Sequence, residues 1–389
     1  MIPIAYNLRS LAVRRATTLA SVIGIGLVVF VLAGALMLSA GIQQTLGKSG
    51  KSDIAIVLRK GSDAEMASSI EQPTLALILA APGVKRDASG SPLGIGELLV
   101  VATLDKVGVD GVSNVQIRGV PENVTQFRAG VQIVDGRAAR PGTDEVIIGQ
   151  RLRGRFKGLD LGQSFELRKN RQAQVVGVFS HEGSSHESEI WADIDSMRQV
   201  FGRSGLYSSV RVQLSAPSQF DAFEAVIEGD KALGLDALRE DRYYEKQSEG
   251  TSIFVTGLGV VIAIIFSIGA MIGAMITMYA AVANRTREIG TLRALGFRRR
   301  SVLSAFLIEA IMLSLIGGAV GVGLASFMSL VHISTTNFST FSELAFGFAL
   351  APDIVVSTLI FAVVMGIVGG FLPAVRASRL NILSALRSA

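Results

Sequence analysis

The sequence ANRTREIGTLRALGFRRRS runs from Ala283 to Ser301, between two long apolar segments. Ile289, Leu292 and Leu295 are spaced three residues apart, which predicts a short amphipathic helix with one apolar edge. Gly296 stands where such a helix would end, because glycine readily adopts the left-handed conformation that closes a last turn. This stretch contains six arginines and a single acidic residue, Glu288. We therefore expect a basic helix at a membrane surface whose apolar edge binds another protein.

The composition limits the class of protein. The chain has 389 residues, of which 49% are hydrophobic and only 18% charged, so membrane segments are expected. Because there are no cysteines, a disulfide framework and Cys-ligated metal sites are excluded. The net charge of +5 does not indicate nucleic acid, because the basic residues cluster beside apolar runs.

Four apolar runs predict four transmembrane helices, with a large α+β extracytoplasmic domain inserted between helices 1 and 2. Helices 1 to 4 are expected at 16–47, 251–283, 301–331 and 353–373, the last ended by Pro373. The remaining segments are an amphipathic segment 1–15, the domain 48–250, the basic loop 284–300, a Phe-rich loop 332–352 and a tail 374–389.

The domain at 48–250 has charges of both signs and short β-like runs separated by Gly, Asp and Pro. The expected strands include residues 53–58, 97–101, 115–120, 145–148, 174–179 and 209–214. Residues 193–201 and 217–235 are expected to be helical. About 200 residues are enough for an independent core.

The arginines orient the chain. The amino-terminal segment, the basic loop and the tail together hold twelve arginines and one acid, so all three are expected in the cytoplasm. Runs 1 and 2 exceed 30 residues and would extend past the ~30 Å hydrocarbon core, either as a stalk or as a frayed end. A cleaved signal peptide is the alternative for run 1, but its apolar region is too long.

Two features lie within the predicted spans. Gly317 and Gly321 have the small-xxx-small spacing that lets helices approach closely, either within one subunit or in a dimer. Glu309 is an intramembrane acid and by default a functional candidate. It lies near the cytoplasmic surface, so an ion pair with an arginine such as Arg298 or Arg300 is the favoured interpretation, and a proton or substrate role is the alternative.

Two stretches resemble enzyme motifs, but their residues do not have the spacing that those motifs require. Gly47-Lys48-Ser49 resembles the end of a phosphate loop, but the required first glycine would stand at position 42, which is Ile. His181 and His186 are five residues apart across a Gly-Ser-Ser turn, unlike a helical zinc motif, so a solvated loop is expected. With three histidines in the chain, a catalytic triad has few candidates. We expect no catalytic residue, no metal site and no cofactor-binding site.

Several motifs resemble the MacB/FtsX-like permeases, the type VII ABC transporter superfamily. Residues 284–297, NRTREIGTLRALGF, look like that family's NRxREIGxLRALG loop, and Phe371–Leu380 with Ala385–Arg387 resemble its closing signature. The domain landmarks Gly136-Arg137, Asp144–Gly149, Val175–Phe179 and Ile190-Trp191 are similar to those of its periplasmic core domain.

This resemblance implies a dimeric, non-catalytic permease subunit, without a fused ATPase domain, in the bacterial inner membrane. Each basic loop would be a coupling helix in a groove of a separate ABC ATPase, which would bind ATP and Mg. Movement of helices 1 and 2 would then drive the outer domain, which is mechanotransmission. Arg298, Arg299 and Arg300 are instead expected to anchor to anionic headgroups. The residues implied for coupling are Arg285, Arg287, Glu288, Ile289, Gly290, Leu292, Arg293, Leu295, Gly296 and Phe297.

Two functions follow from this resemblance. The first is an export or lipid/lipoprotein-extraction pump, with a possible periplasmic adaptor and outer-membrane channel. The second is a signalling device that activates a periplasmic enzyme such as a cell-wall hydrolase. The size of the domain favours the pump. A receptor without an ATPase is disfavoured by the coupling-loop match.

Overall fold

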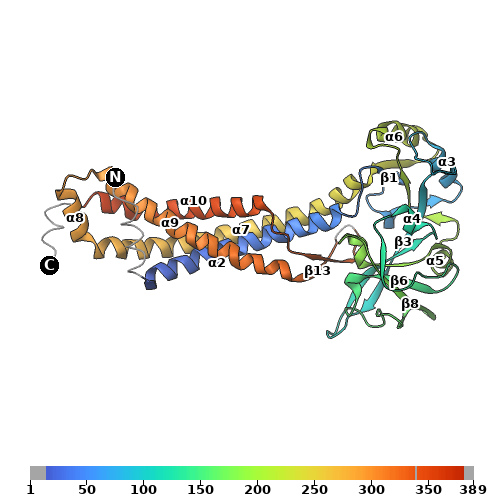
Figure 1. Ribbon diagram of the computed structural model, residues 1–389, viewed down its shortest axis with the longest axis horizontal. Helices are drawn as coiled ribbons and strands as arrows, with labels where there is room; N and C mark the ends of the chain where they lie inside the picture. The colour runs from blue at the N-terminus through green and yellow to red at the C-terminus, as the bar shows by residue number, and fades with distance from the viewer. Residues whose placement is uncertain (1–14, 338–339, 381–389) are drawn as a thin grey trace. The chain divides into compact units, whose positions relative to one another are not determined.

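The computed structural model describes residues 15–337 and 340–380, which form a helical unit and an α+β unit (Figure 1). The helical unit comprises Met1–Gly41, Ile253–Val331 and Gly347–Ala389, and the α+β unit comprises Ile42–Ser252 and His332–Phe346. Most of the amphipathic segment 1–15, and Ala385–Arg387 of the closing signature, lie outside the described residues.

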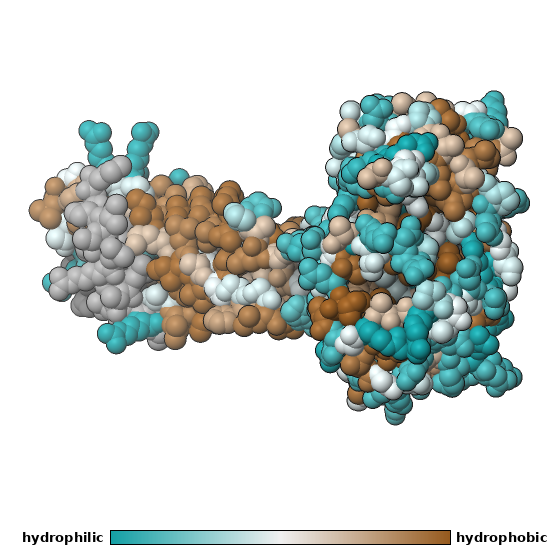
Figure 2. All heavy atoms as spheres, turned by 45° about the vertical axis from the view of Figure 1, so that its right-hand side comes forward, coloured by the Kyte–Doolittle hydropathy of each residue, from teal (hydrophilic) through white to brown (hydrophobic). Residues whose placement is uncertain are grey.

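Among the described residues, four helices are long and apolar enough to cross a membrane, judged by length and composition. They are α2 (Arg15–Gly47), α7 (Glu240–Asn284), α9 (Arg299–Ser326) and α10 (Pro352–Ser378). The short helix α8 (Thr286–Ala294) joins α7 to α9, and η5 (Phe327–Leu330) extends α9. In Figure 2 hydrophobic residues predominate on the coloured surface of this unit.

The prediction that Pro373 ends the fourth span was wrong. Pro373 lies inside α10, which continues to Ser378. Proline removes one helical hydrogen bond and disfavours the helix. However, Ala374 and Ala377 beyond it are completely buried against Phe306 of α9 and Met278 of α7. This packing holds the last turn in helical form.

Glycines allow the helices of this unit to approach closely. A Cβ added to Gly321 would lie 2.4 Å from the carbonyl oxygen of Gly26, and one added to Gly317 would lie 3.0 Å from that of Val22. A Cβ on Gly366 of α10 would similarly lie 2.3 Å from the Ser314 hydroxyl of α9. The predicted glycine pair therefore packs α9 against α2 within one chain.

The α+β unit is built on one ten-stranded sheet of order β12-β1-β11-β3-β4-β9-β6-β8-β5, with β7 also paired to β8. The strands are β1 (Ile54–Arg59), β3 (Gly94–Asp105), β4 (Val112–Val120), β5 (Gln132–Gly136), β6 (Glu145–Gly149), β7 (Ser164–Arg168), β8 (Arg171–Ser180), β9 (Glu189–Asp193), β11 (Ser209–Gln213) and β12 (Leu235–Arg239). A separate two-stranded sheet pairs β2 (Ile70–Glu71) with β10 (Leu206–Tyr207). Every strand expected from the sequence is present.

Short helices accompany the sheet. They are α3 (Thr74–Ala80), α4 (Val124–Phe127), α5 (Ile194–Phe201) and α6 (Phe220–Gly229), with one-turn helices η1 (Glu65–Ala67), η2 (Gln150–Leu152), η3 (Ser185–Ser188) and η4 (Pro217–Gln219). The helix expected at 217–235 was too long. The chain takes a positive φ at Gly234, and Leu235 and Ala237 then alternate into the core as strand β12.

Two predicted boundaries also shift. Helix α7 begins at Glu240, eleven residues before the predicted start at 251, because Tyr243 and Tyr244 are buried in the α+β unit. The segment 332–352 is not simply a loop. It contains the hairpin β13 (His332–Thr336) and β14 (Glu343–Gly347), and residues 332–346 belong to the α+β unit.

Candidate functional site

Helix α8 has a fixed side and an exposed side. Ile289 is only 2% exposed and packs with Val282, Val302 and Phe306 of the helical unit. Leu295, which the sequence placed on the same edge, is 73% exposed. The predicted apolar edge is therefore divided: Ile289 faces the core of its own chain, and Leu295 is available to a partner.

Arg285 fixes the beginning of α8. Its Nη1 donates to Glu309 Oε2 at 3.1 Å, and its Nε donates to Glu288 Oε2, also at 3.1 Å. The guanidinium also lies 5.5 Å from the ring centroid of Phe306. Glu309 thus forms the expected ion pair, but its partner is Arg285 and not Arg298 or Arg300. The reason is that Arg285, at the start of α8, is buried, whereas Arg298 and Arg300 are exposed to solvent.

The end of α8 has the predicted glycine cap. Gly296 has φ +91°, the N–H of Phe297 donates to the carbonyl of Leu292, and the N–H of Gly296 donates to that of Arg293, each at 3.2 Å. This is the pair of bonds of a Schellman motif. A capped end and an anchored start hold α8 as a defined surface element.

The ten residues expected to contact an ATPase fall into two groups. Arg285, Ile289 and Gly290 are buried within this chain. The others are exposed or half-buried: Arg287, Glu288, Leu292, Arg293, Leu295, Gly296 and Phe297. The Nε of Arg293 is buried without a hydrogen-bond acceptor among the described residues. Contact with an ATPase stays a prediction for the whole set.

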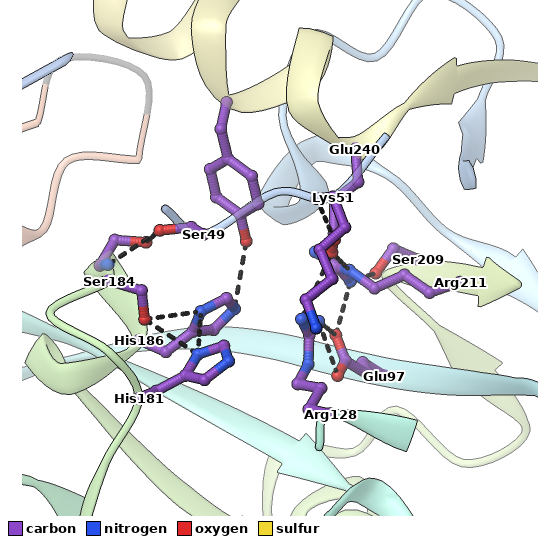
Figure 3. Close-up of polar contacts among 12 residues, drawn as sticks. Ser49, Lys51, Glu97, Arg128, His181, Ser184, His186, Ser209, Arg211 and Glu240 are labelled. Atoms are coloured by element: carbon purple, nitrogen blue, oxygen red, sulfur yellow. Dashed lines mark hydrogen bonds and ion pairs between the residues drawn. The ribbon is translucent and has the colours of Figure 1, made fainter. Parts of the chain in front are cut away.

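A second candidate site, the ionic cluster, lies in the α+β unit, and Figure 3 shows its members Glu97, Arg128, Arg211 and Glu240. It consists of the almost fully buried residues Glu65, Glu97, Arg118, Arg128, Glu189, Arg211 and Glu240. Arg118 donates to both oxygens of Glu189 at 2.8 Å. Arg211 joins the strands to the first residue of α7, because its Nε donates to Glu240 Oε1 at 2.8 Å and its Nη1 to Glu65 Oε1 at 2.7 Å.

The charges of this cluster stabilise one another. Burial alone would raise the pKa of Glu65, but Arg118 and Arg211 lower it well below its usual value. The pKa of Glu97 is also lowered, because Arg211, Arg128 and Arg118 outweigh its burial. Glu65 and Glu97 can thus remain ionised beside these arginines. The cluster holds four strands, η1 and the start of α7 together.

The histidines adjoin this cluster, so the expected solvated loop was wrong. His186 is completely buried, and its Nε2 lies 3.2 Å from the Tyr244 hydroxyl of α7. Its Nδ1 lies 3.3 Å from Nδ1 of His181, and the hydroxyl of Ser184 lies within 3.4 Å of both nitrogens (Figure 3). The Gly-Ser-Ser turn folds both rings inward, where they bond to each other.

The end of α2 is fixed beside these histidines. The Ser49 hydroxyl donates to the carbonyl of Thr45 at 3.0 Å and accepts from the backbone N–H of Ser185 at 2.8 Å. The α+β unit thus binds the last turn of α2 through Ser49 and the first turn of α7 through Glu240. Sequence reasoning missed both contacts. The available signal was a charged residue, Arg118 or Arg211, between apolar residues of a predicted strand.

The family landmarks of the domain also meet in space. Arg137 donates two hydrogen bonds of 2.6 Å to Glu145, which lowers the pKa of that carboxyl well below its usual value. Trp191 Nε1 donates to Glu189 Oε2 at 2.9 Å, so this landmark supports the ionic cluster. No group of three or more metal-ligating residues occurs within 15–337 and 340–380.

Comparisons with known families match both parts of the chain. A model described as the MacB-like periplasmic core domain matches residues 16–229, and one described as the FtsX-like permease C-terminal matches residues 260–382. Together they span most of the sequence.

Known proteins resemble the chain as well. Macrolide export ATP-binding/permease protein MacB 2 of Aeromonas hydrophila is 30% identical over 95% of this chain and 57% of its own length. MacB of Escherichia coli K12 is 32% identical over 56% of this chain and 34% of its own length. The chain therefore spans between a third and about half of these relatives.

Two solved structures each match about half of the chain. The periplasmic region of MacB from Actinobacillus actinomycetemcomitans covers 53% of this chain and 96% of its own, with 11% identity and a TM-score of 0.37. The extracellular domain of the Gram-positive transporter YknZ covers 48% of this chain and 99% of its own, with 19% identity and a TM-score of 0.34.

Proposed function

Because the chain belongs to the MacB/FtsX-like permeases, a family of membrane-embedded ABC transporter permeases, we propose that it converts ATP hydrolysis by an ABC ATPase into movement of its α+β unit. The observation that carries this proposal is the divided helix α8. Its start and one face are fixed to the helical unit through Arg285 and Ile289, whereas Leu295 is exposed. A partner that binds the exposed side would move the anchored helix with it.

The fixed helix ends in the α+β unit supply the other half of the proposal. α7 is one uninterrupted helix of 45 residues, and Glu240 at its start is bound by Arg211 and, at 3.4 Å, by Arg128. Removing one partner from such a buried pair leaves an uncompensated charge, at a cost of about 3–5 kcal/mol. We therefore expect a force along α7 to move the sheet together with the helix, because the Glu240 contacts are costly to break.

We infer that α8 and both termini face the cytoplasm of the inner membrane and that the α+β unit lies outside. The arginine bias of the sequence supports this orientation. We further propose a dimer, a separate ATPase chain that supplies ATP and Mg, and export of a cargo through a periplasmic adaptor and outer-membrane channel. The names of the MacB relatives support export in preference to signalling.

The experiment begins with the tagged full chain in its native membrane. An ABC ATPase that co-purifies would be reconstituted with it in lipid nanodiscs, and ATP hydrolysis would be measured with and without the permease. We expect stimulation by the native chain and none by Leu295→Asp at equal incorporation. Failure to recover an ATPase, or full stimulation by Leu295→Asp, would contradict the proposal. Recovery of a wall hydrolase instead of an adaptor would favour the signalling device.

A further inference from the structure

Two free strand edges of the α+β unit line one groove. Residues 101–105 of β3 and 164–169 in and after β7 line a groove of about 650 Å³, within the usual range for binding clefts. β3 pairs with β4 along one edge, but on its other edge it pairs with β11 only up to Glu97. Within 15–337 and 340–380, β7 pairs with β8 alone. The sheet is thus open between β3 and β7.

The backbone alternation shows which groups face this opening. On the open side of β3, the carbonyl of Glu97 accepts from Ser208 N–H, Leu99 N–H donates to the Ser208 hydroxyl, and the carbonyl of Asp105 accepts from Lys157 N–H. Because alternate residues of a strand direct N–H and C=O to the same edge, Val101 and Thr103 also point there.

The N–H and C=O groups of Val101 and Thr103 lack a pairing strand. No strand or backbone hydrogen bond within the described residues pairs with Val101 or Thr103 on this side. The edge from Leu99 to Asp105 is about 20 Å long at ~3.3 Å per residue. It is closed at one end by Ser208 and at the other by Lys157, so the opening has a defined length.

The floor of the groove is apolar. Leu104 of β3 and Phe165 and Leu167 of β7 belong to a single hydrophobic cluster, and Ala102 packs against it. Thr103 and Glu166 lie on the outer face and are exposed. A strand placed between β3 and β7 would direct every second side chain towards this cluster and the others to solvent.

The charges at the rim of the groove favour a ligand with an acidic residue at one end. Asp105 lies 3.9 Å from Lys157, and Glu166 accepts from the backbone N–H of Asn170 at 2.9 Å. Arg168 donates to the carbonyl of Val200. Lys169 is exposed and forms no ion pair with any residue that the structure describes. Among the described residues neither Arg168 nor Lys169 has a carboxylate partner, and Lys169 has no hydrogen-bond acceptor to replace one.

We propose that an extended segment of a partner protein adds to the sheet between β3 and β7, with apolar side chains at alternate positions and an acidic residue beside Lys169. Main-chain hydrogen bonds supply affinity in this mode of recognition, and alternate side chains supply specificity. The inference does not depend on ATPase coupling, because every residue involved lies in the α+β unit.

Hydrogen–deuterium exchange of the full-length protein in detergent tests this site. The probe is an acetylated hexapeptide that alternates threonine and valine and ends in aspartate. We expect fast exchange of the Val101 and Thr103 amides in the free protein and several-fold slower exchange with the peptide at millimolar concentration. Residues 107–111 should not change. A matched peptide with a central proline, which removes a backbone donor, should give no protection.

Two variants sharpen the test. Lys169→Glu should weaken protection by the acidic peptide, and rescue by a lysine-ended peptide would confirm the charge contact. Thr103→Pro should abolish binding while the β3–β4 ladder survives, because its N–H points away from β4. Equal protection by the proline peptide, no protection at all, or amides already protected in the free protein by a second copy would each overturn the proposal.

Discussion

Arg285 and Glu309, 24 residues apart, form a buried ion pair of 3.1 Å that fastens the start of α8 to α9. Each side chain is 7% exposed. The pair explains why an acid is tolerated inside an apolar helix, and it makes the basic loop part of the helical unit.

Breaking this pair should destabilise the helical unit. We expect Arg285→Gln or Glu309→Gln alone to cost up to about 3–5 kcal/mol, because each removes one partner of a buried ion pair. The double variant should cost less than the sum of the two, which thermal unfolding of the detergent-solubilised protein would measure as a double-mutant cycle. Additive effects would show that the two side chains are not coupled.

The two sides of α8 should respond differently to substitution. Ile289→Ala should lower stability by about 2–5 kcal/mol, because it opens a cavity in a packed core. Leu295→Ala should leave stability within about 0.5 kcal/mol, since the residue is exposed, yet reduce stimulation of the partner ATPase. Melting curves and ATP hydrolysis on the same preparations separate packing from docking. Loss of stability in Leu295→Ala would contradict the division.

Close packing of α9 on α2 predicts a contrast between two glycines. Gly321→Ala should destabilise the helical unit, because its Cβ would lie 2.4 Å from the Gly26 carbonyl oxygen. Gly323→Ala, whose Cβ would meet no atom within 4 Å, should be neutral or slightly stabilising. Thermal unfolding in detergent measures both. Equal changes in stability for the two variants would show that α9 does not pack against α2 through Gly321.

The buried histidines predict a loss of stability on mild acidification. Burial, followed by the nearby Arg128, lowers the pKa of His181 to about 4 in the folded protein, against 6.5 for the free side chain. Burial lowers the pKa of His186 well below 6.5. Between these values the unfolded state binds more protons, so stability should fall as the pH drops from 6.5 towards 4, by about 3 kcal/mol for His181 alone.

Melting curves between pH 7 and pH 5 would isolate this effect, because Glu65 and Glu97 begin to lose their contribution to stability only near their unfolded pKa of 4.5. His181→Asn combined with His186→Asn should flatten the pH dependence in this window. An unchanged slope in that double variant would assign the acid sensitivity to other groups.

The proposed orientation predicts where reporters will lie. A reporter fused after Gly250 should be active only outside the cytoplasm, whereas one fused after Gly296 should be active only inside it, because arginine-rich loops are retained in the cytoplasm. Paired alkaline phosphatase and fluorescent-protein fusions measure this. The reverse pattern would invert the orientation and remove α8 from the reach of a cytoplasmic ATPase.

The sequence alone predicted the four apolar helices, the strands expected in the α+β domain and the family. Hydrophobic run length and strand alternation are local properties, and the family loop is a contiguous motif. The cap at Gly296 was predictable for the same reason, because a left-handed turn depends on one residue.

Only the tertiary structure decided which charges and small residues meet. Glu309 pairs with Arg285 rather than the nearer Arg298 or Arg300, and Arg211 reaches Glu240 across two distant elements. Pro373 remains helical because neighbouring helices bury the turn beyond it. The histidines turn inward to a tyrosine of α7. These outcomes depend on burial by residues remote in sequence, and no local pattern encodes which remote surface that is.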